Sequence, residues 1–346
     1  MRLIHRLVYS LFIVVIAITT ASCSPGGSSS VSSGPAPEQS TIVLDAVPTA
    51  DAAGIYIALD DGFFAKQGLT VKINTINGGE LGMADLQDGK AQLVEGNYVS
   101  FILAQIARKY EGKPISMAMI ADTSQMQPGN QALYVMPDSK FKTVADLAKY
   151  HATIGINTIN NIGQVLLGSL FQANGISMRE VNQATDLLPD LPSDLATHKV
   201  LQGHALDAAW LPEPFGTIAE QGFGAVQLAD FDQGSLQNFP IGTVVGDPTW
   251  IKEHPNTVAA FLRAFQQGQQ IADTNRAAVE QALEKHTGAP AGIAATMTID
   301  TYPLVMDVST MQRVSDAMFE FGLEPGLKQA YPITSMIQPE PGEIGS

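Results

Sequence analysis

Apolar runs typical of strands alternate with helical periodicity along most of this chain, and the alternation runs twice. Residues 41–121 contain four short strand-like runs separated by helical segments. The pattern restarts near residue 133 and continues to about residue 245. Strands that alternate with helices favour parallel sheets that are covered by helices on both faces. The sequence therefore predicts an α/β protein with two halves built on a similar plan.

The bounds of the expected elements follow from turn and capping residues. Strands are expected at residues 41–47, 69–73, 91–94, 115–121, 133–136, 153–157, 205–210 and 241–245. Helices are expected at residues 51–64, 78–89, 98–107, 144–149 behind an N-cap at Thr143, 162–174 behind Asn160 and Asn161, 195–201, and from Pro212 to about 222. Beyond Pro248 the chain is expected to be mainly helical as far as Phe321.

The N-terminus has the pattern of a secretory signal. Arg2 and Arg6 flank an apolar run at residues 7–18, and small residues lead into Cys23, the only cysteine of the chain. This arrangement resembles a bacterial lipoprotein signal, in which the cysteine is lipidated and becomes the new N-terminus. Thr20 departs from the large aliphatic residue usual at its position, and an ordinary cleaved signal with an incidental Cys23 is the alternative. We expect residues 1–22 to be the signal.

A stretch rich in Ser, Gly, Pro and Ala follows the signal, from residue 23 to residue 40. Such a stretch cannot bury enough apolar surface to offset the entropy of ordering it. It is expected to be a flexible tether between the lipid on Cys23 and a folded body of about 300 residues. A body of that size is large enough for its hydrophobic core to divide into two.

Charge and motif content exclude several classes of function. The net charge is −15, and it becomes −17 once Arg2 and Arg6 leave with the signal. Such an acidic chain is a poor candidate for binding nucleic acid. A P-loop, a G-x-S-x-G elbow and an HExxH motif are all absent, and His198 and His204 have no known metal-ligand spacing. We expect no catalytic residues, no cofactor and no metal.

Polar residues cluster where the expected strands end, which is where open α/β sheets bind their ligands. Hydroxyls, amides and the free N–H groups of helix starts would all be available there. The alternative interpretation is that Asp51, Ser124 and Asn160 are simple N-caps, although an N-cap can also contact a ligand, and that Trp210 is a plain core residue. The candidate ligand-binding residues are Thr49, Asp51, Glu95, Asn97, Asp122, Thr123, Thr158, Asn160, Asn161, Trp210 and Glu213.

These clusters contain acids and no arginine. None of the arginines beyond the signal lies in these clusters. A site that clamps a strong anion usually shows arginine forks, although helix N-termini alone can hold an anion. The composition therefore favours a neutral or cationic ligand with hydrogen-bonding edges, on which Trp210 could stack.

Several segments together resemble one family, the substrate-binding proteins of ABC importers in the sulfonate, taurine, nitrate and thiamine-pyrimidine group. The similar segments are residues 60–71 (DDGFFAKQGLTV), 86–94 (LQDGKAQLV), 144–147 (VADL) with 154–156 (IGI), 203–215 (GHALDAAWLPEPF), and 254–261. Each is loose alone, but their order and spacing are specific. They span residues 41 to about 322, nearly the whole mature body.

The resemblance implies a type II periplasmic-binding-protein-like fold, with two Rossmann-like lobes joined by a hinge and a ligand cleft between them. Lobe 1 would comprise residues 41–124 and 247–338, lobe 2 residues 125–246, and residues 339–346 would be a tail. Thr49, Asn97, Thr123, Asn160, Trp210 and Glu213 fall where such proteins contact their ligand. Closure of the lobes around the ligand would present both to a membrane permease.

The expected function is that of an extracytoplasmic lipoprotein, a monomer held at the outer face of a membrane or in the periplasm. It would capture a small organic solute and deliver it to a permease and its ATPase. A nitrogenous, pyrimidine-like solute is favoured, and sulfonate, taurine or nitrate are the alternatives. Other functions compatible with the fold are a pyrimidine-synthase-like enzyme and a ligand-sensing lipoprotein without a permease.

Overall fold

The structure is a computed structural model that describes residues 34–337, except 77, 157–160, 177–185, 189–200, 202 and 324–325. The described residues form one compact unit. The expected signal, the lipidation site Cys23, the site residues Thr158 and Asn160, and nearly all of the expected helix at 195–201 lie outside the described residues.

The first sheet has five strands in the order β2 (Thr70–Thr75), β1 (Thr41–Ala46), β3 (Leu93–Asn97), β12 (Pro240–Gly246) and β6 (Ala118–Gln125). β1 is parallel to both of its neighbours, but β12 is antiparallel to β3 and to β6. The expectation of a wholly parallel sheet was therefore wrong, because a strand from late in the chain is inserted between β3 and β6.

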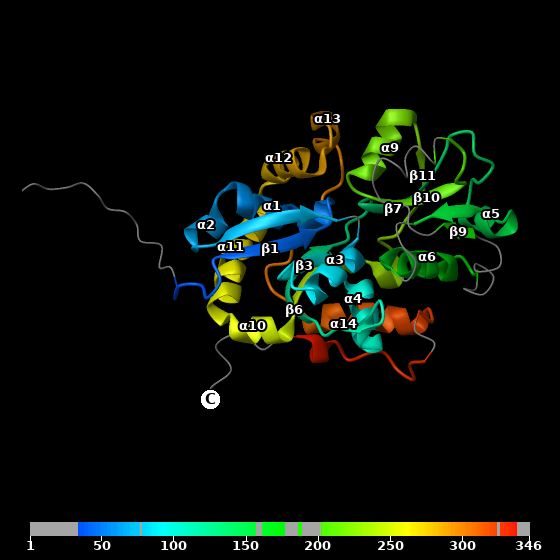
Figure 1. The fold of residues 1–346 in the computed structure, drawn as a ribbon. Coiled ribbons are helices and arrows are strands. Elements are labelled where there is room, and N and C mark those ends of the chain that lie inside the picture. Colours follow the sequence, from blue (N-terminus) through cyan, green and yellow to red (C-terminus); the bar gives the residue numbers. More distant parts are fainter. Residues whose placement is uncertain are drawn as a thin grey trace, which may run out of the picture. The chain divides into compact units, whose positions relative to one another are not determined.

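The second sheet has the order β11 (Val226–Asp230), β7 (Gln131–Val135), β10 (Ala208–Pro212), β8 (Thr153–Gly155) and β9 (Asp186–Leu188). β10, β8 and β9 are parallel, whereas β7 is antiparallel to both β10 and β11. This sheet is also mixed. Both sheets together give the two-part α/β architecture that the alternation predicted (Figure 1).

Helices cover both sheets. Their bounds are α1 (Ala53–Asp60), α2 (Phe63–Lys66), α3 (Gly79–Gln87), α4 (Tyr98–Ala107), α5 (Val144–Lys149), α6 (Ile162–Ala173), α9 (Phe215–Phe223), α10 (Pro248–Glu253), α11 (Pro255–Thr274), α12 (Arg276–Thr287), α13 (Ala291–Ala294) and α14 (Val308–Glu320). Three 3-10 turns, η1 (Ala50–Ala52), η2 (Gly234–Leu236) and η3 (Ile333–Met336), and a hairpin of β4 (Lys109–Tyr110) and β5 (Lys113–Pro114) complete the described elements.

Local capping explains several helix starts. Thr143 caps α5 in a reciprocal capping box with Asp146, as its position predicted. Asn161 caps α6, and Asn97 caps α4 by accepting a hydrogen bond from the Ser100 N–H at 3.0 Å. The expectation that Pro212 begins a helix was wrong. β10 continues through Pro212, where that residue still pairs with β7, and α9 begins only at Phe215.

The region after Pro248 is less helical than expected. α13 is followed by residues 295–307, which run in extended or irregular conformation, and Thr301 pairs there with Gln125 at the end of β6. No apolar stripe of helical period marks this stretch. Its place beside the junction of the two sheets is what orders it.

Three hydrophobic cores support the sheets in the described part of the chain. The smallest packs α9 against β7 and β10 of the second sheet. In another, α1 packs against α11 and α12 over the first sheet. The third is continuous between the sheets, because α4 and α14 both contact α6 (Figure 1). Burial of Phe101, Leu166 and Met318 in this shared core holds the two halves together.

The chain crosses between the sheets twice, at residues 126–130 and 231–239. The return crossing comes before β12, so residues 240–246 belong to the first sheet, although the sequence assigned them to lobe 2. A division that follows the sheets moves that boundary from 246 to about 239. The two halves also touch through the backbone, where the Ala50 N–H donates to the Glu213 carbonyl at 3.2 Å.

The expected tether range of 23–40 includes residues that belong to the folded body. Glu38, inside the expected range of 23–40, accepts hydrogen bonds from the N–H groups of Asn256 and Thr257 at 3.0 and 2.8 Å. These N–H groups lie at the start of α11 and have no partner within the helix. The Glu38 side chain therefore acts as a cap that fixes the chain to the folded body.

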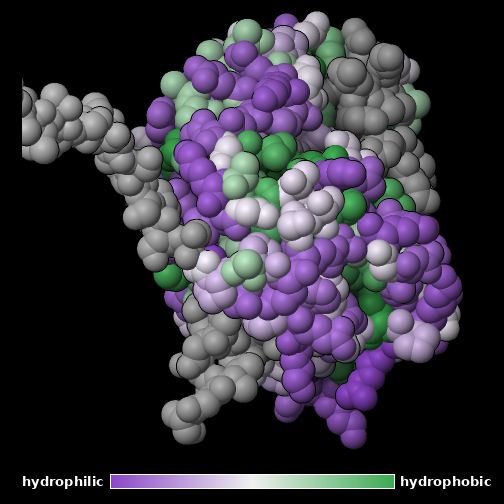
Figure 2. Space-filling model, turned by 60° about the vertical axis from the view of Figure 1, so that its left-hand side comes forward, coloured by the Kyte–Doolittle hydropathy of each residue, from purple (hydrophilic) through white to green (hydrophobic). Residues whose placement is uncertain are grey.

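Hydrophilic residues cover much of the face shown in Figure 2, with apolar residues exposed mainly in a band across its middle. Within the described residues, none of the helices has both the length and the apolar character needed to cross a membrane.

Candidate functional site

A cavity lies where the two sheets face one another, and about 40 Å³ of it is open to the centres of water molecules. It has room for roughly three water molecules. The first wall of the cavity comprises residues from the first sheet and its connections, namely Val47, Thr49, Asp51, Gly78, Gly79, Glu95, Gly96, Asn97, Ile241 and Gly242. The second wall comprises Gln131, Ile162, Trp210 and Pro212.

Five of the residues predicted from strand ends meet in this cavity. They are Thr49, Asp51, Glu95, Asn97 and Trp210. Asn161 is fully buried as the N-cap of α6, directly before Ile162 of the second wall. The structure therefore brings together predicted residues that are far apart in the chain. Their contact with a ligand remains a prediction.

Three other predicted residues are buried beside the cavity without lining it. Asp122 accepts a hydrogen bond from the hydroxyl of Tyr98, and burial raises its pKa to about 6. Thr123 is fully buried next to the position of Gly242, and Glu213 is engaged elsewhere. The sequence placed these side chains at the right edge of the sheet but could not give their direction.

The sequence reasoning missed Gln131, Ile241 and Gly242. The candidate residues were taken only from the carboxyl ends of strands that were expected to be parallel. β7 and β12 are antiparallel to their neighbours, so their first residues lie at the edge where the parallel strands end. Gln131 begins β7, and Ile241 and Gly242 begin β12 after Pro240. Only the pairing direction, which the sequence did not reveal, identifies them.

Glu95 and Asp51 are the ionisable groups of the cavity lining. Glu95 is 1% exposed, and burial, together with the nearby charge of Asp51, raises its pKa to about 8. The Val47 N–H donates to Glu95 Oε2 at 3.1 Å. Asp51 accepts from the hydroxyls of Thr49 at 2.6 Å and Ser124 at 2.7 Å. Glu95 is therefore mainly an uncharged acid at neutral pH, and both Asp51 oxygens already accept hydrogen bonds.

Helix starts supply the opposite polarity. The first turns of α3, α4 and α6 adjoin the cavity through Gly79, Asn97 and Ile162. Helix N-termini carry partial positive charge and free N–H donors. Among the described lining residues there is no Arg, Lys or His. The donors of the helix starts and the acids of the first wall offset one another, which suits a ligand without a full charge.

Close backbone packing forms part of the first wall. A Cβ atom on Gly96 would lie 2.6 Å from the Cα of Gly79, and one on Gly242 would lie 2.2 Å from Thr123 Oγ1. Neither distance is compatible with a side chain. These glycines allow α3, β3 and β12 to approach the cavity as bare backbone.

Trp210 is the main residue of the second wall. It is 4% exposed, and its Nε1 donates to Gln131 Oε1 at 2.9 Å. A Cβ atom on Gly163 would lie 2.9 Å from the indole ring, so the start of α6 packs tightly against it. The ring is held in place on both sides before any ligand arrives.

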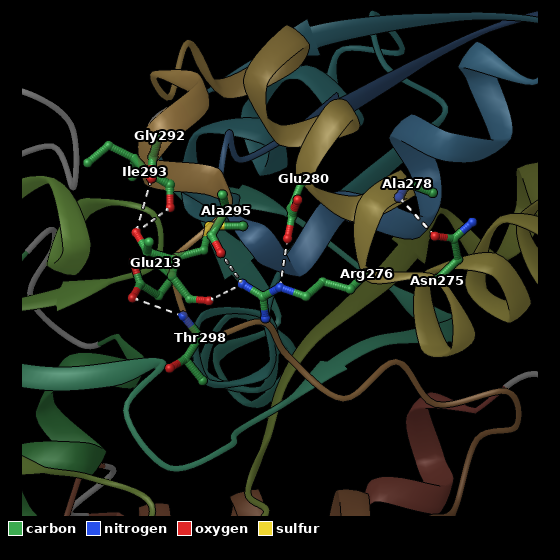
Figure 3. A network of polar contacts seen from close by, with 11 residues as sticks. Glu213, Asn275, Arg276, Ala278, Glu280, Gly292, Ile293, Ala295 and Thr298 are labelled. Atoms are coloured by element: carbon green, nitrogen blue, oxygen red, sulfur yellow. Dashed lines mark hydrogen bonds and ion pairs between the residues drawn. The ribbon is translucent and has the colours of Figure 1, made fainter.

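Glu213 belongs to a polar network behind the second wall (Figure 3). Its carboxylate accepts from the Thr217 hydroxyl at 2.7 Å and N–H at 3.1 Å, and from the Thr298 N–H at 3.4 Å. Burial raises its pKa to about 7, although these hydrogen bonds act in the opposite direction. Arg276 holds the same segment from the other side, donating to the carbonyls of Ala295 at 3.3 Å and Met297 at 2.6 Å. Glu213 thus ties the turn after β10 to residues 295–298.

The family of the chain follows from comparison with known proteins. A model of the NMT1-like family matches residues 35–285. The nitrate/nitrite binding protein NrtA of Synechococcus elongatus is 24% identical over 279 residues, which cover 72% of this chain and 59% of the relative. The chain thus spans less than two thirds of that relative's length.

Solved structures share the fold. The periplasmic nitrate-binding protein NrtA from Synechocystis PCC 6803 matches with a TM-score of 0.72 at 17% identity, covering 88% of this chain and 87% of that one. The alkanesulfonate-binding protein SsuA from Xanthomonas axonopodis pv. citri, bound to MOPS, matches with a TM-score of 0.69 at 15% identity, covering 87% and 99%. The desulfurization enzyme DSZB matches with a TM-score of 0.62 at 14% identity, covering 88% and 97%.

These matches agree with the two mixed sheets and the cavity between them. The chain belongs to the NMT1-like family and has the periplasmic-binding-protein fold of the nitrate- and sulfonate-binding components of ABC importers.

Proposed function

We propose that this protein is the solute-binding component of an ABC importer, which captures a small molecule between its two sheets and delivers it to a permease. The observation that carries the proposal is the cavity, because residues from both sheets line it and two chain crossings connect the sheets. A ligand that contacts both walls stabilises the closed arrangement of the halves by those contacts. The binding functions named for the nitrate and alkanesulfonate relatives support the same reading.

For the ligand we propose a small nitrogenous solute of the pyrimidine type. The lining offers two acids, several donors and an indole ring, and none of its described residues is a cation. A nitrate or sulfonate ion bound here would face Asp51 without an opposing Arg or Lys.

Thermal-shift screening of the mature domain tests this proposal, since a ligand that binds only the folded state raises the melting temperature. Aminopyrimidines, nitrate, taurine and alkanesulfonates form the panel. Trp210→Phe should weaken the shift of the ligand that binds, and Trp250→Phe, a change outside the cavity, should not. The proposal fails if none of the panel shifts the protein and native mass spectrometry finds no co-purified small molecule.

We further propose that the protein is a monomer tethered to the outer face of a membrane by a lipid on Cys23. The support is the signal pattern at residues 1–22 and the single cysteine that follows it. Cys23→Ser should move the protein from the membrane fraction to the soluble fraction and remove labelling by an alkyne fatty acid. Membrane association that survives this substitution contradicts the lipid anchor.

The DSZB match shows that the fold also serves an enzyme, and a permease-free sensor would use the same cavity. We propose binding without catalysis because the buried acids beside the cavity are paired with hydroxyls and N–H groups and have no nucleophile–base arrangement in the described residues. Recovery of an added ligand unchanged after prolonged incubation checks this. Uptake that depends on a co-expressed permease and ATPase distinguishes an importer component from a sensor.

A further inference from the structure

The uncharged state of Glu95 has a consequence for what the cavity recognises. Glu95 lines the first wall almost without exposure, and its Oε2 is held by the Val47 N–H. The other oxygen, Oε1, lies beside Gly242, since a Cβ atom there would be 3.2 Å away from it. Gly242 itself lines the cavity. One carboxyl oxygen is therefore held by the backbone, and the other lies beside Gly242 and the Thr123 hydroxyl, on a side chain that lines the cavity.

We infer that Glu95 binds the ligand as a neutral carboxylic acid, donating its O–H to a ring nitrogen of an uncharged aminopyrimidine-type solute and accepting from the adjacent amino group. This inference rests on the proposed solute-binding function and specifies its chemistry. A protonated carboxyl offers one donor and remaining acceptor capacity on one edge. A ring nitrogen next to an amino group offers the complementary acceptor and donor.

The surroundings favour this pairing over an ionic one. Asp51, on η1, is the nearest charged neighbour and repels a second negative charge at Glu95. Burial raises the pKa of Tyr56, on α1, which therefore stays uncharged. Buried Asp300 faces Asp51 and has its own pKa raised by burial. The described lining residues from α3, α6, β7, β10 and β12 include no titratable group.

A ligand with a full charge of either sign would fit the cavity less well. A cation would meet the positive ends of α3, α4 and α6, and an anion would meet Asp51. An uncharged solute avoids both penalties. Since Glu95 in the free protein holds its proton up to about pH 8, no proton needs to be taken up when such a solute binds at pH 7.

The test measures the affinity for 4-aminopyrimidine by calorimetry between pH 6.5 and pH 9.5. The affinity should be constant up to about pH 7.5 and fall about tenfold per pH unit above the pKa of Glu95. Glu95→Gln keeps a donor and an acceptor on the same edge, so it should bind within about threefold of the parent protein at pH 7 and lose the alkaline decline. Glu95→Ala should bind at least about tenfold more weakly, because the pairing edge is gone.

Asp122→Asn is the matched control, because Asp122 is another buried acid of the first sheet that does not line the cavity. It should leave the decline above pH 8 in place. Affinity that rises with pH, or a tenfold loss in Glu95→Gln, would mean that an ionised Glu95 holds a cation and would overturn the inference.

Two further measurements separate this inference from the proposed function. Carboxyl NMR of the ligand-free protein, assigned by difference with Glu95→Gln, should show Glu95 titrating near pH 8; titration in the usual range of a glutamate overturns the inference without reference to any ligand. Nitrate or taurine that binds where 4-aminopyrimidine does not would overturn the ligand chemistry while supporting solute binding.

Discussion

The two walls of the cavity differ in chemistry. The first wall carries both ionisable groups, Asp51 and Glu95, together with glycine backbone, whereas the described second wall has an indole ring, an amide, an isoleucine and a proline. Under the proposed function, the first wall would select a ligand by hydrogen bonding and protonation. The second wall would select it by shape. Polarity and fit are assigned to different parts of the fold, and substitutions on each side should have different consequences.

Removing the indole of the second wall should have the largest effect. Trp210→Ala is expected to lower the free energy of unfolding by about 3–5 kcal/mol, because a large buried side chain leaves a cavity beside Gly163 and Gln131. Urea unfolding measures this change. Trp250→Ala, which removes a partly buried indole that donates to Gln39, should cost less. If both variants lost the same free energy of unfolding, Trp210 would contribute no more to stability than an indole outside the cavity.

The buried acids of both halves should make stability depend on pH. Glu95, Glu213 and Asp122 have pKa values raised to about 8, 7 and 6. Each contributes stability that is complete below its pKa in the unfolded chain and is lost as pH rises through its pKa in the folded protein. The melting temperature should therefore be higher at pH 5 than at pH 8.

Glu95→Gln sharpens that test. The folded protein must keep Glu95 protonated at pH 7, which lowers the free energy of unfolding by roughly 3 kcal/mol, and the substitution should remove this loss. The fall in melting temperature with rising pH should then become shallower. Thermal unfolding of both proteins from pH 5 to pH 9 gives the comparison. An unchanged decline in the variant would place the pH dependence outside the first wall.

Adding a side chain to the closely packed backbone of the first wall should lower the free energy of unfolding by an intermediate amount. Gly96→Ala puts a methyl group 2.6 Å from the Cα of Gly79, and the shift of α3 that relieves it is expected to cost about 1–3 kcal/mol. Gly222→Ala is the matched control, because no atom lies within 4 Å of a Cβ there, and in helix α9 it should be neutral or slightly stabilising. Chemical unfolding of the two variants decides whether close packing at Gly96 matters.

The smallest change expected concerns the network behind the second wall. Thr217→Val removes the hydroxyl that donates to Glu213 Oε1 and should cost about 1–2 kcal/mol at pH 8, and less at pH 5, where Glu213 is protonated. Thr296→Val, on the exposed neighbouring turn, should change stability by less than about 0.5 kcal/mol. A pH-independent cost in Thr217→Val would show that the charge of Glu213 is not what the hydroxyl stabilises.

Much of the fold was available from local sequence signals. The capping residues Thr143 and Asn161, and the glycine that ends the α3 segment, gave helix bounds close to those observed. Strand direction was not available, because an apolar run such as residues 241–245 has the same composition whichever way it pairs. The inserted strand β12 and its lobe assignment were therefore missed.

The candidate site was predicted to a similar extent. The rule for parallel strands led to Glu95, Asn97 and Trp210. It could not separate side chains that enter the cavity from those, such as Asp122, that turn toward Tyr98. That choice depends on the pleat of a strand relative to its neighbours, which is a tertiary property.

The contact between Gly79 and Gly96 limits how the selectivity of this protein can be altered. Two bare backbones already touch there, so no side chain can be introduced at either position without displacing α3 or β3. Gln131, Ile162 and Trp210 have side chains that can be exchanged. Substitutions that are meant to redirect the protein to another solute should therefore be made in the second wall, with Gly79 and Gly96 left unchanged.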